Sequence, residues 1–139
     1  MHFYSAIIRT IFKKQTINQL FLIPHNLGKG KIMPMRIEVM QPTGHLDATS
    51  TNYFRQQAGI VLDRKPDVLL VDLQHLKQMD SSGLGALIFA LRSAKAIGCK
   101  FAICSISEYV DFFLEATSMK DLFNVFENRH QFERSFKKV

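Results

Sequence analysis

Apolar residues recur along this chain with two different periods, and the two periods alternate from residue 36 onward. Apolar residues at alternate positions, such as Ile37 and Val39, are typical of a strand, and Pro42 marks an edge strand or the end of this one. Longer apolar runs bounded by aspartate are typical of central strands covered on both faces. Four segments are predicted to be strands: 36–44 (RIEVMQPTG), 67–73 (DVLLVDL), 100–106 (KFAICSI) and 122–126 (LFNVF).

Other segments have apolar residues every three or four positions, which predicts helices. We expect Asp47 or Thr49 to cap the first helix and Ser107 to cap the third, because short polar side chains accept bonds from the free N–H groups of a first turn. The adjacent Phe112 and Phe113 are expected to belong to the core. The predicted helices are 46–64 (LDATSTNYFRQQAGIVLDR), 84–97 (LGALIFALRSAKAI), 107–119 (SEYVDFFLEATSM) and 128–138 (NRHQFERSFKK).

Strands that alternate with helices at this pitch predict an α/β fold with a largely parallel sheet. In such sheets, functional residues tend to lie in the loops that follow the carboxyl ends of the strands. The stretch 80–83 (DSSG) follows the strand predicted at 67–73, so we expect it on that side. Asp63, Asp67 and Asp72 are expected to be solvated ends of their elements.

Charge is distributed unevenly along the chain. The 139 residues are enough for one domain, and their net charge is +6. Residues 1–35 hold five basic residues and no acidic one, so the remainder has 18 − 5 = 13 basic and 12 acidic residues, a net charge of +1. Binding to a phosphate backbone needs a clustered basic face, so we expect no direct nucleic-acid partner. The five basic residues are Arg9, Lys13, Lys14, Lys29 and Lys31.

The two cysteines and the apolar runs indicate a cytoplasmic protein. Cys99 and Cys104 are too far apart for a CxxC pair and are predicted to be free thiols, which suits a reducing compartment. No apolar run reaches the roughly 20 residues needed to span a bilayer, and residues 1–24 lack the continuous apolar core of a signal peptide. We therefore expect no stable membrane insertion; weak adsorption of this basic, partly apolar segment to a membrane is left open.

The stretch Asp80-Ser81-Ser82-Gly83 is the strongest candidate for function. A serine nucleophile would need a histidine base, usually with a GxSxG turn, and a nucleotide cradle would need GxxxxGK[ST] or GxGxxG; none of these patterns is present. The five histidines lack metal-ligand spacing, so we expect no metal, cofactor or catalytic residue. Residue types alone leave two alternatives, a structural helix cap and a docking surface. Gly83 and Gly85 would each weaken a helix by about 1 kcal/mol relative to alanine, and they could leave room for the backbone of a partner.

The stretch 68–91 (VLLVDLQHLKQMDSSGLGALIFAL) resembles the phosphorylation-site signature of the anti-sigma factor antagonists, the STAS-domain family. The resemblance extends over about residues 36–132, including an upstream Gly-x-Leu-Asp pattern at Gly44, Leu46 and Asp47. The family fold is a small α/β domain in which a mixed sheet has its helices largely on one side. The signature is matched at Asp72, Leu73, Met79, Asp80, Ser81, Ser82, Gly83, Leu84 and Gly85.

This resemblance implies a phosphorylation switch. Family members bind an anti-sigma factor that is also a serine kinase and thereby free the sigma factor; phosphorylation of the serine after the aspartate, here Ser81, abolishes binding. A PP2C-type, metal-dependent serine phosphatase reverses it. The residues expected to contact the partner are Asp80, Ser82, Gly83, Leu84, Gly85, Asp47 and Thr49. We expect Gly83→Val to harm partner binding more than stability.

Two departures from the family pattern leave questions open. Residues 1–32 have no assignable counterpart, so we divide the chain into a basic extension, 1–32, and a STAS domain, 33–139, and Met33 or Met35 is an alternative start. The family's first strand is either supplied by 19–24 (QLFLIP) or absent. His45 replaces an often acidic residue and could alter partner choice.

The alternative function is that of a structural STAS subunit in a stress-signalling or lipid-transport complex.

Overall fold

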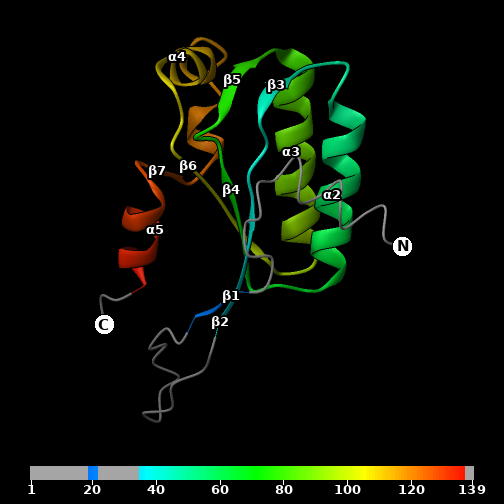
Figure 1. Cartoon of the computed structure of the whole chain (residues 1–139), viewed down its shortest axis with the longest axis vertical. Coiled ribbons are helices and arrows are strands. Elements are labelled where there is room, and N and C mark those ends of the chain that lie inside the picture. Colours follow the sequence, from blue (N-terminus) through cyan, green and yellow to red (C-terminus); the bar gives the residue numbers. More distant parts are fainter. Residues whose placement is uncertain (1–18, 22–34, 137–139) are drawn as a thin grey trace.

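A mostly parallel sheet forms the centre of the molecule. The computed structural model describes residues 19–21 and 35–136. The sheet has five strands in the order β1-β2-β4-β6-β7, in which β1 is antiparallel to β2 and each other neighbouring pair is parallel (Figure 1). Its strands are β1 (Gln19–Phe21), β2 (Met35–Met40), β4 (Val68–Asp72), β6 (Lys100–Cys104) and β7 (Val125–Phe126).

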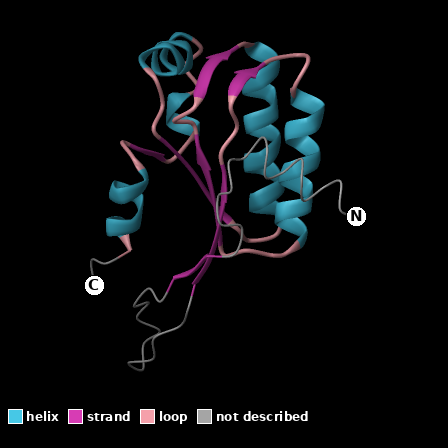
Figure 2. Ribbon diagram, viewed as in Figure 1, coloured by secondary structure: helices cyan, strands magenta, loops and turns pink. Residues whose placement is uncertain are grey.

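The helices cover the sheet unequally. α2 (Thr51–Asp63) and α3 (Ser81–Ala96) lie side by side on one face, whereas the short α5 (Arg129–Ser135) lies on the other (Figure 2). α4 (Glu108–Ala116) lies at the end of the sheet where the parallel strands finish and continues into a 3-10 turn, η1 (Lys120–Leu122). The predicted α/β fold, with a mixed, mostly parallel sheet and helices largely on one side, is confirmed.

Beyond their carboxyl ends, β2 and β4 continue as a second, two-stranded parallel sheet. Its strands are β3 (Gly44–Leu46) and β5 (Leu76–Met79). At the junction Asp72, only 3% exposed, accepts hydrogen bonds from the Gln41 side chain (3.1 Å) and the Gln74 N–H (3.0 Å). The expectation that Asp72 is solvated was wrong, because this carboxylate holds the ends of both strands where they leave the main sheet.

Several predicted boundaries change for local reasons. The strand predicted at 36–44 is interrupted after Met40, where Pro42 cannot donate to a ladder. Residues 74–79, for which no element was predicted, contain β5, and only Val125–Phe126 of the segment 122–126 is a strand. The N-cap position of α2 is Ser50, whose side chain accepts no capping bond from the first turn, so neither Asp47 nor Thr49 has the expected capping role. Ser107 does cap α4, accepting from the Val110 N–H at 3.2 Å.

The N-terminal segment contributes one strand to the sheet. β1 pairs with β2 so that Gln19 opposes Ile37 and Phe21 opposes Met35. Residues 19–21 of the segment 19–24 therefore do supply a strand of the sheet. They belong to the extension 1–32 that the sequence analysis separated from the domain. Leu22, Ile23 and Pro24 lie outside the described residues. The division at residue 33 stays a prediction.

Two apolar clusters flank the sheet. The larger one joins α2, α3 and α4 to one face, with Phe54, Leu87 and Leu114 among its most buried members. The smaller one lies under α5, where Phe132 makes edge contacts with Phe126 and Phe136. Phe113 is half-buried against the larger cluster, but Phe112 is 73% exposed, so its predicted place in the core was wrong.

Both cysteines are buried free thiols, and this predicts a pH dependence of stability. Burial raises the pKa of Cys99 to about 11 and that of Cys104 to about 12. In the unfolded chain a thiol ionises near pH 8.5, so the unfolded state binds fewer protons above that pH and the free energy of unfolding should fall as pH rises, by up to about 1.4 kcal/mol per thiol per pH unit.

Urea denaturation from about pH 8 to 10.5 would measure this slope, because the range extends from just below the ordinary thiol pKa to well above it. The matched control is the Cys99→Ala/Cys104→Ala variant, which will be less stable throughout but should lose the thiol part of the slope. Equal slopes for the two proteins would contradict the prediction.

Candidate functional site

The candidate site lies at the carboxyl ends of the two short strands, where β3 leads into the loop before α2 and β5 leads into α3. The strand register places Leu46 opposite Met79, so Asp47 and Asp80 follow neighbouring positions. The Asp80 N–H donates to the Leu46 carbonyl at 3.3 Å, which fastens one turn to the other. The structure thus brings together two groups of predicted site residues that are more than thirty positions apart in the sequence.

Asp80 caps α3. Its backbone is extended, and its Oδ1 accepts a hydrogen bond from the Gly83 N–H at 3.0 Å. This side chain satisfies one of the free N–H groups of the first turn. Ser81 is the first residue of the helix and is exposed, while Ser82 is half-buried. Since the aspartate supplies the cap, the exposed Ser81 is not needed for capping.

Gly83 is required for packing inside the domain. A Cβ on this residue would lie 2.0 Å from the Leu46 carbonyl oxygen and 2.7 Å from the Met79 Cγ. A backbone carbonyl cannot yield as the end of a flexible side chain can, so any larger residue must displace the first turn of α3 from β3. The interpretation of Gly83 as clearance for a partner is therefore corrected: the backbone that approaches it belongs to this chain.

The turn after β3 is held by its own polar groups. Asp47 Oδ1 accepts hydrogen bonds from both the hydroxyl and the N–H of Thr49, the latter at 2.9 Å. The Thr49 side chain and then its backbone lower the pKa of Asp47, with the nearby His45 contributing in the same direction. Ser50 donates to the His45 carbonyl at 2.8 Å. Asp47 and Thr49 therefore form a fixed, polar, anionic turn beside Asp80.

Gly85 lies on the outer side of α3. The nearest heavy atom to a Cβ placed there would be Arg55 Nη2 at 3.8 Å, an ordinary contact with a flexible side chain. Arg55, from α2, also lies over the Phe89 ring, with its Cζ 5.3 Å from the ring centre. Together with four further residues of α3, Gly85 and Phe89 line a groove of about 390 Å³ along the helix. The others are Ile88, Arg92, Ser93 and Ala96.

This groove was missed by the sequence analysis. The available signal was the spacing of Ser81, Gly85 and Phe89, four residues apart and therefore on one side of a helix. Leu84, which was predicted to contact a partner, is only 7% exposed and supports the turn from within.

Two features are absent from the described residues, a cluster of metal ligands and a membrane-spanning helix. They contain no group of three or more histidine, cysteine, aspartate or glutamate side chains placed to hold a metal ion. None of the helices in the same ranges is long and apolar enough to cross a lipid bilayer.

Comparison with known proteins identifies the fold family. The sequence profile of the STAS domain matches residues 34–132, which is most of the chain. This chain belongs to the STAS domain family. The resemblance seen in the sequence is confirmed at this level.

Similar proteins include antagonists of anti-sigma factors. The anti-sigma F factor antagonist of Paenibacillus polymyxa is 23% identical over 91 residues, covering 65% of this chain and 78% of that protein. A sulfate transporter family protein from Wolinella succinogenes has a TM-score of 0.66 at 14% identity, covering 81% of this chain and 96% of its own. The anti-sigma factor antagonist SpoIIAA, unphosphorylated, has a TM-score of 0.61 at 16% identity, covering 88% and 98%. Both structural likenesses show the fold.

The two glycines of this STAS domain should respond to alanine in opposite directions. Gly83→Ala forces a methyl group against the Leu46 carbonyl and should lower the free energy of unfolding by about 3 kcal/mol, the upper range for overpacking. Gly85→Ala meets no obstacle and should raise it by about 0.5–1 kcal/mol, because glycine is a poor helix former.

Urea denaturation of the two variants, each compared with wild type, measures both effects. The pair is matched, since both residues lie in the first turns of α3 and both receive one methyl group. A small effect at Gly83, similar to that at Gly85, would contradict the close packing described here.

Proposed function

We propose that this STAS domain is an anti-sigma factor antagonist that is switched by phosphorylation of Ser81. In its unphosphorylated form it binds a serine-kinase anti-sigma factor in the cytoplasm and releases the sigma factor. Phosphorylation ends binding, and a PP2C-type serine phosphatase restores it. The chain acts as a binding module and not as an enzyme. The observation that carries this proposal is the division of roles at the start of α3, where Asp80 caps the helix and Ser81 is exposed.

The position of Ser81 is suited to a reversible charge. A phosphoserine adds about −1.5 to −2 charges and three acceptor oxygens. At the start of a helix this charge lies near the positive end of the helix dipole, so the domain tolerates it. No structural hydrogen bond of the cap is broken, because that bond belongs to Asp80. The modification therefore changes the surface while the fold persists.

The surroundings of Ser81 explain how the added charge can prevent binding. Asp80 and the Asp47–Thr49 turn already make this edge anionic. A partner that packs closely against Ser82 and the groove beginning at Gly85 would meet both the bulk and the charge of the phosphate. Gly83 and Leu84 contribute from inside, by fixing the height and angle of the turn.

SpoIIAA, which shares this fold, has been solved in both states of modification. Its phosphorylated form, described as a Bacillus cell fate determinant, has a TM-score of 0.55 with this chain at 15% identity. That both forms of SpoIIAA keep the fold supports a switch that acts at the surface.

The serine assignment is tested by phosphorylation of purified variants. Ser81→Ala should keep its stability within about 0.5 kcal/mol of wild type, bind the kinase and take up no phosphate. Ser81→Asp should fold equally well and bind at least about tenfold more weakly, although it carries less charge than phosphoserine. Ser82→Ala is the matched control and should still be phosphorylated.

The experiment combines each protein with the serine-kinase anti-sigma factors encoded in the source genome and ATP, followed by mass spectrometry and a binding titration. Phosphate on Ser82 in the wild-type protein would overturn the residue assignment. Failure of every such kinase to bind or modify the chain would overturn the proposed function and favour a structural STAS subunit of a larger complex.

A further inference from the structure

The outer face of α4 exposes large aromatic side chains. Only Val110 and Leu114 of this helix are buried. Phe112 is 73% exposed and Tyr109 is 50% exposed, and their spacing of three places them on the same side of the helix. We define the α4 face as the exposed residues of this helix: Glu108, Tyr109, Phe112, Glu115 and Ala116. Aromatic residues are enriched at protein interfaces, and a phenylalanine this exposed in the middle of a helix face is suited to binding.

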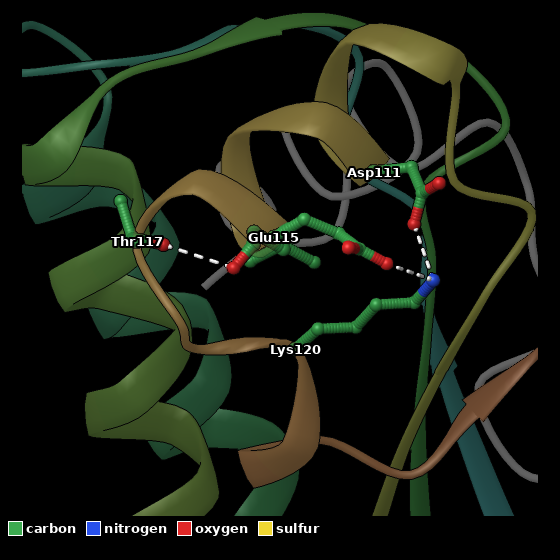
Figure 3. Close-up of polar contacts among 5 residues, drawn as sticks. Asp111, Glu115, Thr117 and Lys120 are labelled. Carbon is green, nitrogen blue, oxygen red and sulfur yellow. Dashed lines mark hydrogen bonds and ion pairs between the residues drawn. The ribbon is translucent and has the colours of Figure 1, made fainter.

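Ion pairs and a hydrogen bond connect the α4 face to the segment that follows it. The Lys120 ammonium bridges Asp111 at 2.7 Å and Glu115 at 3.1 Å, which fastens η1 to α4 (Figure 3). Hydrogen bonding to Asp111 first, and to Glu115 next, raises the pKa of Lys120. The Thr117 hydroxyl donates to the Phe113 carbonyl at 2.9 Å and closes the end of the helix. A fixed surface loses little conformational freedom when a partner binds.

This face is acidic in a basic protein. The face carries Glu108 and Glu115, and the whole segment from α4 through η1, residues 108–122, contains four carboxylates and one ammonium, a net charge of −3, whereas the whole chain carries +6. Lys120 pairs with Asp111 and Glu115, so Glu108 and Asp121 are the carboxylates of this described segment that form no ion pair. Complementary charge on a partner would therefore be positive. The same partner must also present apolar groups, to cover Phe112 and Tyr109.

The α4 face adjoins the site of the proposed switch. α4 packs beside β5, and the Tyr109 hydroxyl lies 3.4 Å from the Met79 carbonyl oxygen, immediately before Asp80. The start of α3 and the α4 face are therefore adjacent, and one partner could cover both. Leu122, which is 50% exposed in the braced η1 turn, adds apolar area to the same segment.

We propose that the α4 face is a second docking surface for the kinase partner, and that it receives a basic, apolar element of that protein. The inference rests on the proposed function and deepens it by stating the chemistry of the partner. Phe112 is the apolar anchor, and Glu108 attracts a lysine or arginine side chain that flanks the apolar element. The α3 groove and the α4 face then hold the partner on both sides of Ser81.

Two substitutions in the full chain test this surface. Phe112→Ser should weaken binding of the kinase about tenfold or more, as is typical for loss of a buried aromatic anchor. Glu108→Lys, which touches no ion pair of the α4 face, should weaken it about threefold to tenfold at low salt and reduce its dependence on salt, as expected for a lost charge pair at the rim. The matched controls are Ile97→Ser, an exposed apolar residue at the far end of α3, and Asp63→Lys, an exposed acid at the end of α2; each should change the affinity less than about twofold.

The kinase used is the one that the wild-type chain binds in the preceding test, and all variants should keep the urea midpoint of wild type. If the kinase binds wild type, and binds Phe112→Ser and Glu108→Lys equally well, the α4 face is overturned and the proposed function still stands. If sedimentation showed instead that Phe112→Ser abolishes self-association while kinase affinity is unchanged, the occupant would be a second copy of this chain. Failure of wild type to bind any kinase would overturn both proposals.

Discussion

The approach of α3 to the end of β3 is the constraint on which the arrangement of the site depends. At Gly83 the first turn of the helix lies so near the Leu46 carbonyl that no side chain fits between them. This contact, with the hydrogen bond from the Asp80 N–H to the same carbonyl, fixes the helix start relative to the turn at Asp47. Two loops that are distant in the sequence thus form one surface.

The main sheet positions the two strands that make this contact. Asp72 holds the chain where β2 and β4 leave the main sheet, and β3 and β5 are positioned by that junction. The two glycines of the serine turn have separate roles: Gly83 is needed by the domain itself, whereas Gly85 leaves the outer side of α3 open. The start of α3 is therefore fixed to the domain while its outer side stays free for binding. This arrangement suits a switch that acts without refolding.

Local patterns were sufficient to predict much of the architecture. The main strands, the four helices and the Ser107 cap follow from apolar periodicity and capping chemistry, and these depend on neighbouring residues. β5 was missed because its inner residues, Leu76 and Met79, flank two exposed polar ones, a pattern too short to separate from a loop. The burial of Asp72, the packing of Gly83 and the exposure of Phe112 depend on residues thirty or more positions away, or on how a whole helix is seated, and single-sequence periodicity does not contain that information.

The cap at Asp80 also determines what kind of substrate the chain presents. Ser81 is already the first residue of a helix, and its position depends on β3, a strand that no short segment around the serine contains. Under the proposed function, a kinase must accept a helix start on a folded surface, unlike enzymes that bind their substrates as extended peptides. A peptide cut from residues 77–91 would have to nucleate the helix unaided, which is unfavourable at that length. The kinase would then recognise the folded surface and not a short sequence. Unfolded copies of the chain would not be phosphorylated.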